Sequence, residues 1–103
     1  MYPNNYAFPA LFYYDDDGIS IEFPDLPGCL PCAQTSEEAF HNAKEALGLH
    51  LFGMEQDGDA IPAPTPVKNL QPSAGAAVAM VEVLMPAVRD RINNKVVKKT
   101  LTL

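Results

Sequence analysis

The sequence predicts an α+β fold, with a small three-stranded meander, one helix and a fourth strand. Three patterns indicate this fold: two segments joined at an Asp-Gly turn, an apolar stripe at helical spacing, and a long apolar run nearer the C-terminal end. The chain has 103 residues, of which 48% are hydrophobic and 19% charged. These values are typical of one globular domain rather than of a disordered segment.

The first two strands are predicted to form a hairpin. Residues 6–14 place aromatic side chains at alternate positions, which is the period of a strand. An Asp-Gly turn follows at residues 17–18, and residues 19–23 then alternate apolar and polar side chains. Because Pro9 has no N–H to donate to a ladder, its side of the first strand should be an edge or a strand entry.

A short third strand is predicted within residues 29–33, and a helix follows it. Thr35 is the expected N-cap, and Glu38, three residues later, completes a capping box. The helix should end near Gly53 or Gly58. Its apolar stripe, which we expect to face the core, consists of Phe40, Ala43, Leu47 and Leu51, with Ala39 and Ala46 beside them.

The second half of the chain is predicted to contain an extended crossing and a further strand. Four prolines within residues 59–75 favour a stiff segment without regular structure. Residues 76–85 are almost continuously apolar, so we expect this strand to be central or buried on both faces. Pro86 should end it.

Charge is divided unevenly along the chain, whose formal net charge is −6. Residues 1–66 contain eleven acidic residues and one basic residue, a net charge of −10, whereas residues 67–103 contain six basic and two acidic residues, a net charge of +4. The acidic part therefore favours a basic partner and repels nucleic acid. No apolar run reaches the roughly 20 residues of a membrane span, and no secretory signal is recognisable, so we expect a cytoplasmic protein.

Cys29 and Cys32 have the C-x-x-C spacing of redox pairs and zinc sites. A redox pair needs its first cysteine at a helix N-terminus, but the expected cap lies at Thr35. Zinc needs two further ligands, and His41 and His50 are nine residues apart on one helix, so they project from opposite faces. We therefore interpret the cysteines as half-buried structural thiols, and we expect neither a metal nor a cofactor.

The other polar clusters give no sign of catalysis. Asp15, Asp16 and Asp17 could hold a cation through carboxylate oxygens, although a solvated hairpin tip is the more common arrangement. His50 lies beside the apolar stripe, where a partly buried structural histidine is expected. The sequence has no recognisable nucleophile arrangement and no glycine-rich phosphate loop after a strand. We therefore expect no catalytic residues.

Four segments, taken in their order along the chain, carry a family resemblance. They are Asp-Asp-Gly-Ile-Ser-Ile-Glu-Phe-Pro-Asp-Leu-Pro-Gly-Cys (16–29), Thr-Ser-Glu-Glu-Ala (35–39), Asn-Ala-Lys-Glu-Ala-Leu (42–47) and Asp-Gly-Asp-Ala-Ile-Pro-Ala-Pro (57–64). Over residues 6–85 the chain resembles HicB-type antitoxins of HicA/HicB toxin–antitoxin pairs. The resemblance implies a fold similar to a truncated, degenerate ribonuclease H-like fold. Because residues 6–14 contain no acid to hold a metal ion, it also implies a catalytically inactive relative.

The resemblance further implies a partner, which is a small, basic HicA-type toxin that cleaves RNA and is silenced by the acidic domain. A net charge of −10 over residues 1–66 complements such a partner. The toxin-binding residues that we expect lie at the hairpin tip and around the end of the second strand. They are Asp15, Asp16, Asp17, Glu22 and Asp25.

The C-terminal residues resemble the first strand of a ribbon-helix-helix DNA-binding unit, through which such antitoxins repress their own operon. Lys98, Thr100 and Thr102 would face DNA, while Leu101 and Leu103 would face the core of the unit. The two helices of such a unit do not follow in this sequence. We therefore expect either a fragment of a longer protein or a chain that has lost its operator-binding half.

The predicted organisation is a toxin-neutralising domain over residues 1–87 and a basic linker with the truncated strand over residues 88–103. Specific operator binding is expected only through a complete C-terminal unit. A homodimer or a higher homo-oligomer is also expected.

Two other functions stay open at the level of sequence. A metal-dependent nuclease would use Asp15, Asp16, Asp17 and Glu22, and cleavage of RNA on titration with a divalent ion would identify it. A stand-alone oligomeric adaptor would have no toxin partner, and a toxin gene beside its own would argue against it.

Overall fold

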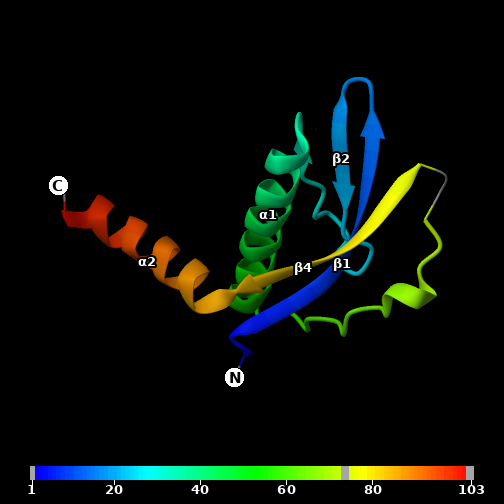
Figure 1. Cartoon of the computed structure of the whole chain (residues 1–103). Helices are drawn as coiled ribbons and strands as arrows, with labels where there is room; N and C mark the ends of the chain where they lie inside the picture. Colours follow the sequence, from blue (N-terminus) through cyan, green and yellow to red (C-terminus); the bar gives the residue numbers. More distant parts are fainter. Residues whose placement is uncertain (1, 73–74, 102–103) are drawn as a thin grey trace.

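The fold is α+β, as predicted, and consists of a four-stranded antiparallel sheet and two helices. The computed structural model describes residues 2–72 and 75–101, of which residues 94–101 are described by their backbone only. Figure 1 shows α1 lying across one face of the sheet and α2 continuing from the end of β4 away from it. The elements in chain order are β1 (Asn5–Asp15), β2 (Gly18–Glu22), β3 (Cys32–Ala33), α1 (Ser36–Asp57), the 3-10 turn η1 (Val67–Asn69), β4 (Ala76–Leu84) and α2 (Met85–Leu101).

The β1–β2 hairpin is confirmed with the predicted turn. Asp15 pairs with Gly18 at its closed end, and Phe12 pairs with Ile21 farther along the strands. Gly18 has φ 142°, and a Cβ atom there would lie 2.9 Å from the carbonyl oxygen of Ala33, so the turn requires glycine. The strands of the sheet follow the order β3-β2-β1-β4.

Pro9 lies where β1 has one neighbour. β1 pairs with β4 from Asn5 to Tyr13, but its pairing with β2 begins only at Leu11. The expectation that one side of Pro9 faces a strand edge is therefore confirmed.

Helix α1 begins and ends at predicted residues. The backbone N–H of Glu38 donates to Thr35 Oγ1 at 3.1 Å, and the Glu38 carboxylate accepts from the N–H of Gln34 at 3.0 Å. The Glu38 carboxylate thus caps the N–H of Gln34, the residue before the N-cap, instead of the N–H of Thr35 itself. Gly58 ends the helix with φ 73°, a left-handed conformation that favours glycine.

The core lies between α1 and the sheet. The buried stripe of α1 consists of Ala39, Ala43, Leu47, Gly48 and Leu51. It packs against a set of fully buried side chains from the sheet and its loops, which includes Phe8, Phe12, Ile21, Phe23 and Leu26. This contiguous core is the main source of stability, because burial of apolar surface stabilises a fold in proportion to its area.

Phe40 was expected to face the core and does so only in part. Its side chain is 52% exposed, although its ring centroid lies 5.1 Å from that of Phe12. Phe40 stands at the margin of the stripe, where α1 no longer covers the sheet. The spacing of apolar residues correctly predicted which face of the helix packs on the sheet. It did not predict how wide a stripe of that face the sheet covers.

The third strand is shorter than predicted. Residues 29–31 have no regular secondary structure and follow a turn that is closed by the bond from the N–H of Cys29 to the carbonyl of Leu26, at 3.1 Å. The carbonyl of Pro31 accepts from the N–H of Ile21 at 2.9 Å. Only Cys32 and Ala33 extend the ladder beside β2.

The prediction of a central or doubly buried fourth strand is wrong. β4 stands at an edge of the sheet, where Val81 and Val83 are buried but Met80 and Leu84 are exposed. The physical reason is that α1 covers one face of the sheet, so that the side chains on the other face of β4 receive no helix within the described residues.

The prediction of a strand within residues 98–103 is wrong for residues 98–101, which belong to α2. Pro86 lies in the first turn of this helix, where its missing N–H leaves no helical bond unmade. Val88 and Ile92, spaced by four, pack against the core. Because helix propagation is cooperative, a short polar–apolar alternation does not stop a helix that is already formed. Thr102 and Leu103 lie outside the described residues.

Candidate partner-binding surface

The structure places the five predicted toxin-binding acids in three different places. Asp15, Asp16 and Asp17 are exposed together at the hairpin tip. Glu22 lies at the other end of β2, about 13 Å along the strand from Gly18. Asp25 lies beyond it in the loop between β2 and β3. The structure therefore brings only the three tip residues together.

Glu22 and Asp25 both make hydrogen bonds within the chain. The hydroxyl group of Tyr13 donates to Glu22 Oε1 at 3.1 Å. Asp25 Oδ2 accepts from the backbone N–H of Thr65 at 2.9 Å, and Asp25 Oδ1 accepts from the hydroxyl group of the same residue. Asp25 thus attaches the proline-rich crossing to the loop after β2. In this structure its carboxylate has a positioning role that the sequence did not reveal.

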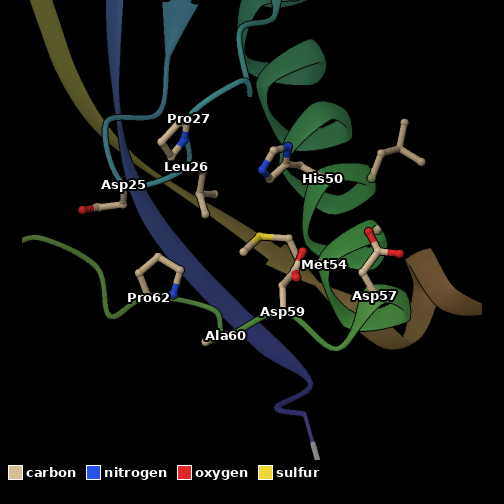
Figure 2. A pocket seen from close by; sticks show the side chains of 11 residues that line it. Asp25, Leu26, Pro27, His50, Met54, Asp57, Asp59, Ala60 and Pro62 are labelled. Carbon is tan, nitrogen blue, oxygen red and sulfur yellow. The ribbon is translucent and has the colours of Figure 1, made fainter.

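An open hollow of about 670 Å³ lies between the C-terminal half of α1, the loop after β2 and the chain after α1. Its apolar lining includes Leu26, Leu49 and Met54, and its polar lining includes Asp25, His50, Asp57 and Asp59. Figure 2 shows His50 and Met54 reaching from α1 toward the loop of Pro27, with Asp57 and Asp59 near the end of the helix. We call this feature the acidic hollow.

The charge in the acidic hollow is uncompensated within the part of the chain that is described. Asp57 stands in the last turn of α1, which contains no basic residue. A helix C-terminus carries partial negative charge and favours cations, so a carboxylate there is unfavourable. The backbone N–H of Asp59 donates to the carbonyl of Met54 at 2.9 Å, but no side-chain hydrogen bond or ion pair among the described residues involves the carboxylate of Asp57 or Asp59. The arrangement is suited to a positively charged group brought by another molecule.

Sequence reasoning did not select Asp57, Asp59 or His50 as partner-binding residues. One signal was available, because acids in the last turn of a predicted helix oppose the helix dipole. The other half of the site was not visible, since the loop of Asp25 and Pro27 is brought to α1 only by the packing of the sheet.

Glu55, also in the last turn of α1, has a different environment. Its side chain is 5% exposed and accepts two bonds from the Arg89 guanidinium, at 3.0 Å from Nε and 2.7 Å from Nη2. Arg89 also donates to Asn4 Oδ1 and to the carbonyl of Pro3. This cluster joins α2, α1 and the N-terminal segment, so Glu55 holds the fold together rather than facing a partner.

The same cluster shifts the protonation of its members. Burial, together with the hydrogen bond that its hydroxyl group donates to Glu55 at 3.1 Å, raises the pKa of Tyr6 to about 12. The hydrogen bonds to Glu55 raise the pKa of Arg89 above its ordinary value. At neutral pH the cluster therefore holds a neutral Tyr6 and a cationic Arg89.

The two cysteines have different surroundings. Cys29 is buried and Cys32 is exposed, and both are free thiols. Burial raises the pKa of Cys29 to about 11, which is opposite to the lowered pKa of a redox-active C-x-x-C thiol. No group of three potential metal ligands occurs among the described residues. Glu22 lies too far from the hairpin tip for a single ion to contact it together with Asp15, Asp16 and Asp17.

Neither of the two helices, within the described residues, is long and apolar enough to cross a membrane.

Comparison with known families gives one match over most of the chain. Residues 8–102 match the family described as HicB-like antitoxins of bacterial toxin–antitoxin systems. Among curated proteins, the chain is 36% identical over 62 residues to an uncharacterized 14.9 kDa protein of Haemophilus phage HP1. It is 34% identical over 61 residues to antitoxin HicB 2 of Photorhabdus laumondii. These matches cover 60% and 59% of the chain, and it spans less than half of these relatives, 47% and 44% respectively.

Solved structures show a similar fold. The N-terminal domain of the Burkholderia pseudomallei antitoxin HicB is 28% identical and has a TM-score of 0.65, over 74% of this chain and 95% of that one. A chain of a toxin–antitoxin complex from Streptococcus pneumoniae is 19% identical and has a TM-score of 0.75, over 95% of each chain. At that identity the second likeness concerns the fold alone.

Proposed function

The chain belongs to the HicB-like antitoxin family of bacterial toxin–antitoxin systems, and from this premise we propose that it binds and inhibits a small, basic, RNA-cleaving toxin of the HicA type. The observation that carries the proposal is the acidic hollow. Asp57 and Asp59 are unpaired there among the described residues, beside the negative end of a helix. A basic partner supplies the charge that this surface lacks, whereas a nucleic acid would be repelled.

The lining of the hollow fits a lysine or arginine side chain. Leu49 and Met54 offer apolar surface to the aliphatic stem of such a residue, while Asp57 and Asp59 receive its charged head. Contacts that are desolvated in this way mainly slow dissociation. We therefore assign the lifetime of the complex to the acidic hollow.

The hairpin tip has a different part in the same proposal. Asp15, Asp16 and Asp17 are exposed, and long-range attraction from exposed charges mainly speeds the encounter of two proteins. Glu22 and Asp25 belong to the proposed interface as well, although their hydrogen bonds to Tyr13 and Thr65 limit how far they can turn toward a partner. We assign the association rate to the tip.

The test measures binding to a purified HicA-type toxin, by surface-attached kinetics at low and moderate salt. The double variant Asp57→Asn/Asp59→Asn should raise the dissociation rate by about thirtyfold, because each of the two lost charged contacts contributes on the order of 1 kcal/mol. The triple variant Asp15→Asn/Asp16→Asn/Asp17→Asn should slow association and flatten its salt dependence, with little change in dissociation.

The control is Glu37→Gln/Glu45→Gln, which removes two charges from α1 outside the hollow. This variant should dissociate from the toxin as the parent chain does. An unchanged dissociation rate in the Asp57/Asp59 variant would exclude the hollow from the interface. Absence of any binding by the parent chain would exclude inhibition of that toxin.

We also propose that longer forms of this protein repress their own operon, with the basic residues 88–103 as a linker to a DNA-binding unit after residues 1–87. The support is the net charge of +4 over residues 67–103. The proposed contacts from Lys98, Thr100 and Thr102 to DNA rest on that charge, because Lys98 and Thr100 belong to α2 rather than to a strand. Competition between operator and scrambled duplex would show a clear preference only for the longer form.

We propose further that the domain acts in the cytoplasm as a non-enzymatic, reduced relative of the ribonuclease H-like fold. The supporting observations are the β1–β2–β3 meander followed by α1 and β4, and the absence of an acid in β1 before Asp15. RNA should therefore remain intact when the chain is incubated with divalent ions. Cleavage that disappears on replacement of Asp15, Asp16 and Asp17 would restore the nuclease alternative.

A further inference from the structure

A second open hollow, of about 580 Å³, adjoins the acidic hollow. The two hollows share the segment that follows α1, because Asp59, Ala60 and Pro62 line both of them. The rest of the lining comes from the N-terminal segment, from β1 and from the proline-rich crossing. It consists of Tyr2, Pro3, Tyr6, Phe8, Ile61 and Pro64. We call this feature the aromatic hollow.

The floor of the aromatic hollow is fixed before any partner binds. The rings of Tyr6 and Phe8 are stacked, with their centroids 6.3 Å apart and their planes at 25° to each other. Both residues are buried. The hydroxyl group of Tyr6 donates to Glu55 Oε2 at 3.1 Å, which holds its ring in place. A partner therefore meets a preformed surface and has few side chains to order on binding.

The wall that the two hollows share is held at both of its ends. The backbone N–H of Asp59 donates to the carbonyl of Met54 at 2.9 Å, and the backbone N–H of Thr65 donates to Asp25 Oδ2 at 2.9 Å. Two prolines lie between these points, and each fixes its own φ angle. Residues 59–65 therefore form a stiff common wall.

The aromatic hollow is apolar where it is open to solvent. Tyr2 is 39% exposed, and Pro62 and Pro64 are exposed as well. Of the described residues that line this hollow, Asp59 alone is charged. Figure 2 shows the side chain of Asp59 extending toward Met54, which lines the acidic hollow. The charge of the common wall thus faces the acidic hollow, and the aromatic hollow offers apolar surface.

We propose that the aromatic hollow takes a large apolar side chain of the same basic toxin that places a lysine or arginine in the acidic hollow. This inference rests on the proposed function and extends its interface across the common wall. The apolar side chain is buried against Tyr2, Pro62 and Pro64. An anchor of this kind, seated in a preformed pocket, slows dissociation, so the two hollows together set the lifetime of the complex.

Both interface size and charge select this occupant. A stable, specific interface buries about 800 Å² on each partner around an apolar centre. One basic side chain in the acidic hollow covers much less, and the aromatic hollow adds apolar surface directly beside it. A basic protein is attracted to the neighbouring Asp57 and Asp59. A second copy of this chain would bring the same carboxylates and be repelled, and a nucleic acid would be repelled by its phosphates.

The experiment measures dissociation of a purified HicA-type toxin from the variant Tyr2→Ala, by surface-attached kinetics at low and moderate salt. Dissociation should be about fivefold faster than from the parent chain, because an apolar contact is lost. The factor should be the same at both salt concentrations, since salt screens charged contacts rather than the burial of apolar surface. Tyr2→Phe keeps the aromatic ring and should dissociate as the parent chain does.

Tyr14→Ala is the matched control. Tyr14 is a tyrosine of β1 that is 49% exposed and lines neither hollow. Its variant should dissociate from the toxin at the rate of the parent chain. Because both tyrosines are exposed, neither substitution removes a side chain from the core.

A second measurement reports on the aromatic hollow directly. The chain contains no tryptophan, so Tyr2→Trp places a single indole at its rim. Saturation with the toxin should shift the emission of this indole to shorter wavelength and reduce its quenching by acrylamide, because the partner covers it. Tyr14→Trp should show neither change. The complex of the toxin with the parent chain gives the toxin's own fluorescence for subtraction.

Two results would overturn the inference while the proposed function stands. They are dissociation of Tyr2→Ala at the parental rate, or an unchanged emission of Tyr2→Trp on saturation, in a series where Asp57→Asn/Asp59→Asn still dissociates faster. The interface would then be confined to the acidic hollow. An effect of Tyr2→Ala that fades at moderate salt would overturn the apolar role. Absence of any binding by the parent chain would overturn the proposed function itself, and this inference with it.

Discussion

β1 and β4 are bonded to each other along the whole length of β4, yet they have opposite environments. Phe8, Ala10 and Phe12 of β1 are almost completely buried, with β2 or β4 beside them and α1 above. In β4 only Val81 and Val83 reach comparable burial. The two strands are similarly apolar, so composition does not explain the difference.

This comparison shows that an apolar run predicts that its side chains are buried, but it does not predict which element covers them. For β1 the cover comes from the chain itself. For β4 one face is covered by α1, whereas its other face and its free edge receive no cover within the described residues. The hydrophobic effect acts on area removed from water, whichever chain removes it.

The largest expected effect tests this comparison directly. Phe8→Ala removes a side chain that is 1% exposed and should lower the free energy of unfolding by about 3–5 kcal/mol. Met80→Ala on β4, in dilute solution, should lower it by less than about 1 kcal/mol. Urea denaturation measures both values. Equal losses would mean that β4 is as well covered as β1.

A smaller effect is expected where the ends of β1 and β4 meet. Arg89→Ala leaves the Glu55 carboxylate buried without its ion pair, and should cost about 2–4 kcal/mol of stability. The control is Arg91→Ala, whose partner Glu45 is exposed, and which should cost at most about 0.5 kcal/mol. Thermal or urea unfolding distinguishes the two. A loss in Arg89→Ala no larger than in Arg91→Ala would show that the cluster does not join the helices.

The smallest effect concerns alkaline pH. The pKa of Tyr6 is raised from its ordinary value of 10.0 to about 12, so folding favours the neutral phenol. This contribution to stability is fully present below pH 10 and is lost as the pH rises toward 12. The parent chain should therefore lose more stability across this interval than Tyr6→Phe. Absorbance titration should show one tyrosine of the parent chain that ionises only near pH 12. If the same late ionisation occurs in Tyr6→Phe, it belongs to another tyrosine.

Much of the fold is encoded in short segments and could be predicted from them. The Asp-Gly turn, the Thr35 cap and the Gly58 terminus depend on contacts within a few residues, and the structure confirms each. The edge at Pro9 follows from a missing donor in the backbone. The family, too, was recognisable from the segments at 16–29 and 57–64.

The tertiary structure alone decided which surfaces stay open. The sequence by itself determined the turns, the caps and the apolar faces, because these arise from backbone conformation and side-chain period within one element. It did not determine that β4 ends the sheet, that Phe40 lies at the margin of α1, or that Asp57 and Asp25 line one hollow. Each of these depends on how elements far apart in the sequence pack together. One helix covers only part of one face of the sheet, and this limit decides which side chains remain exposed.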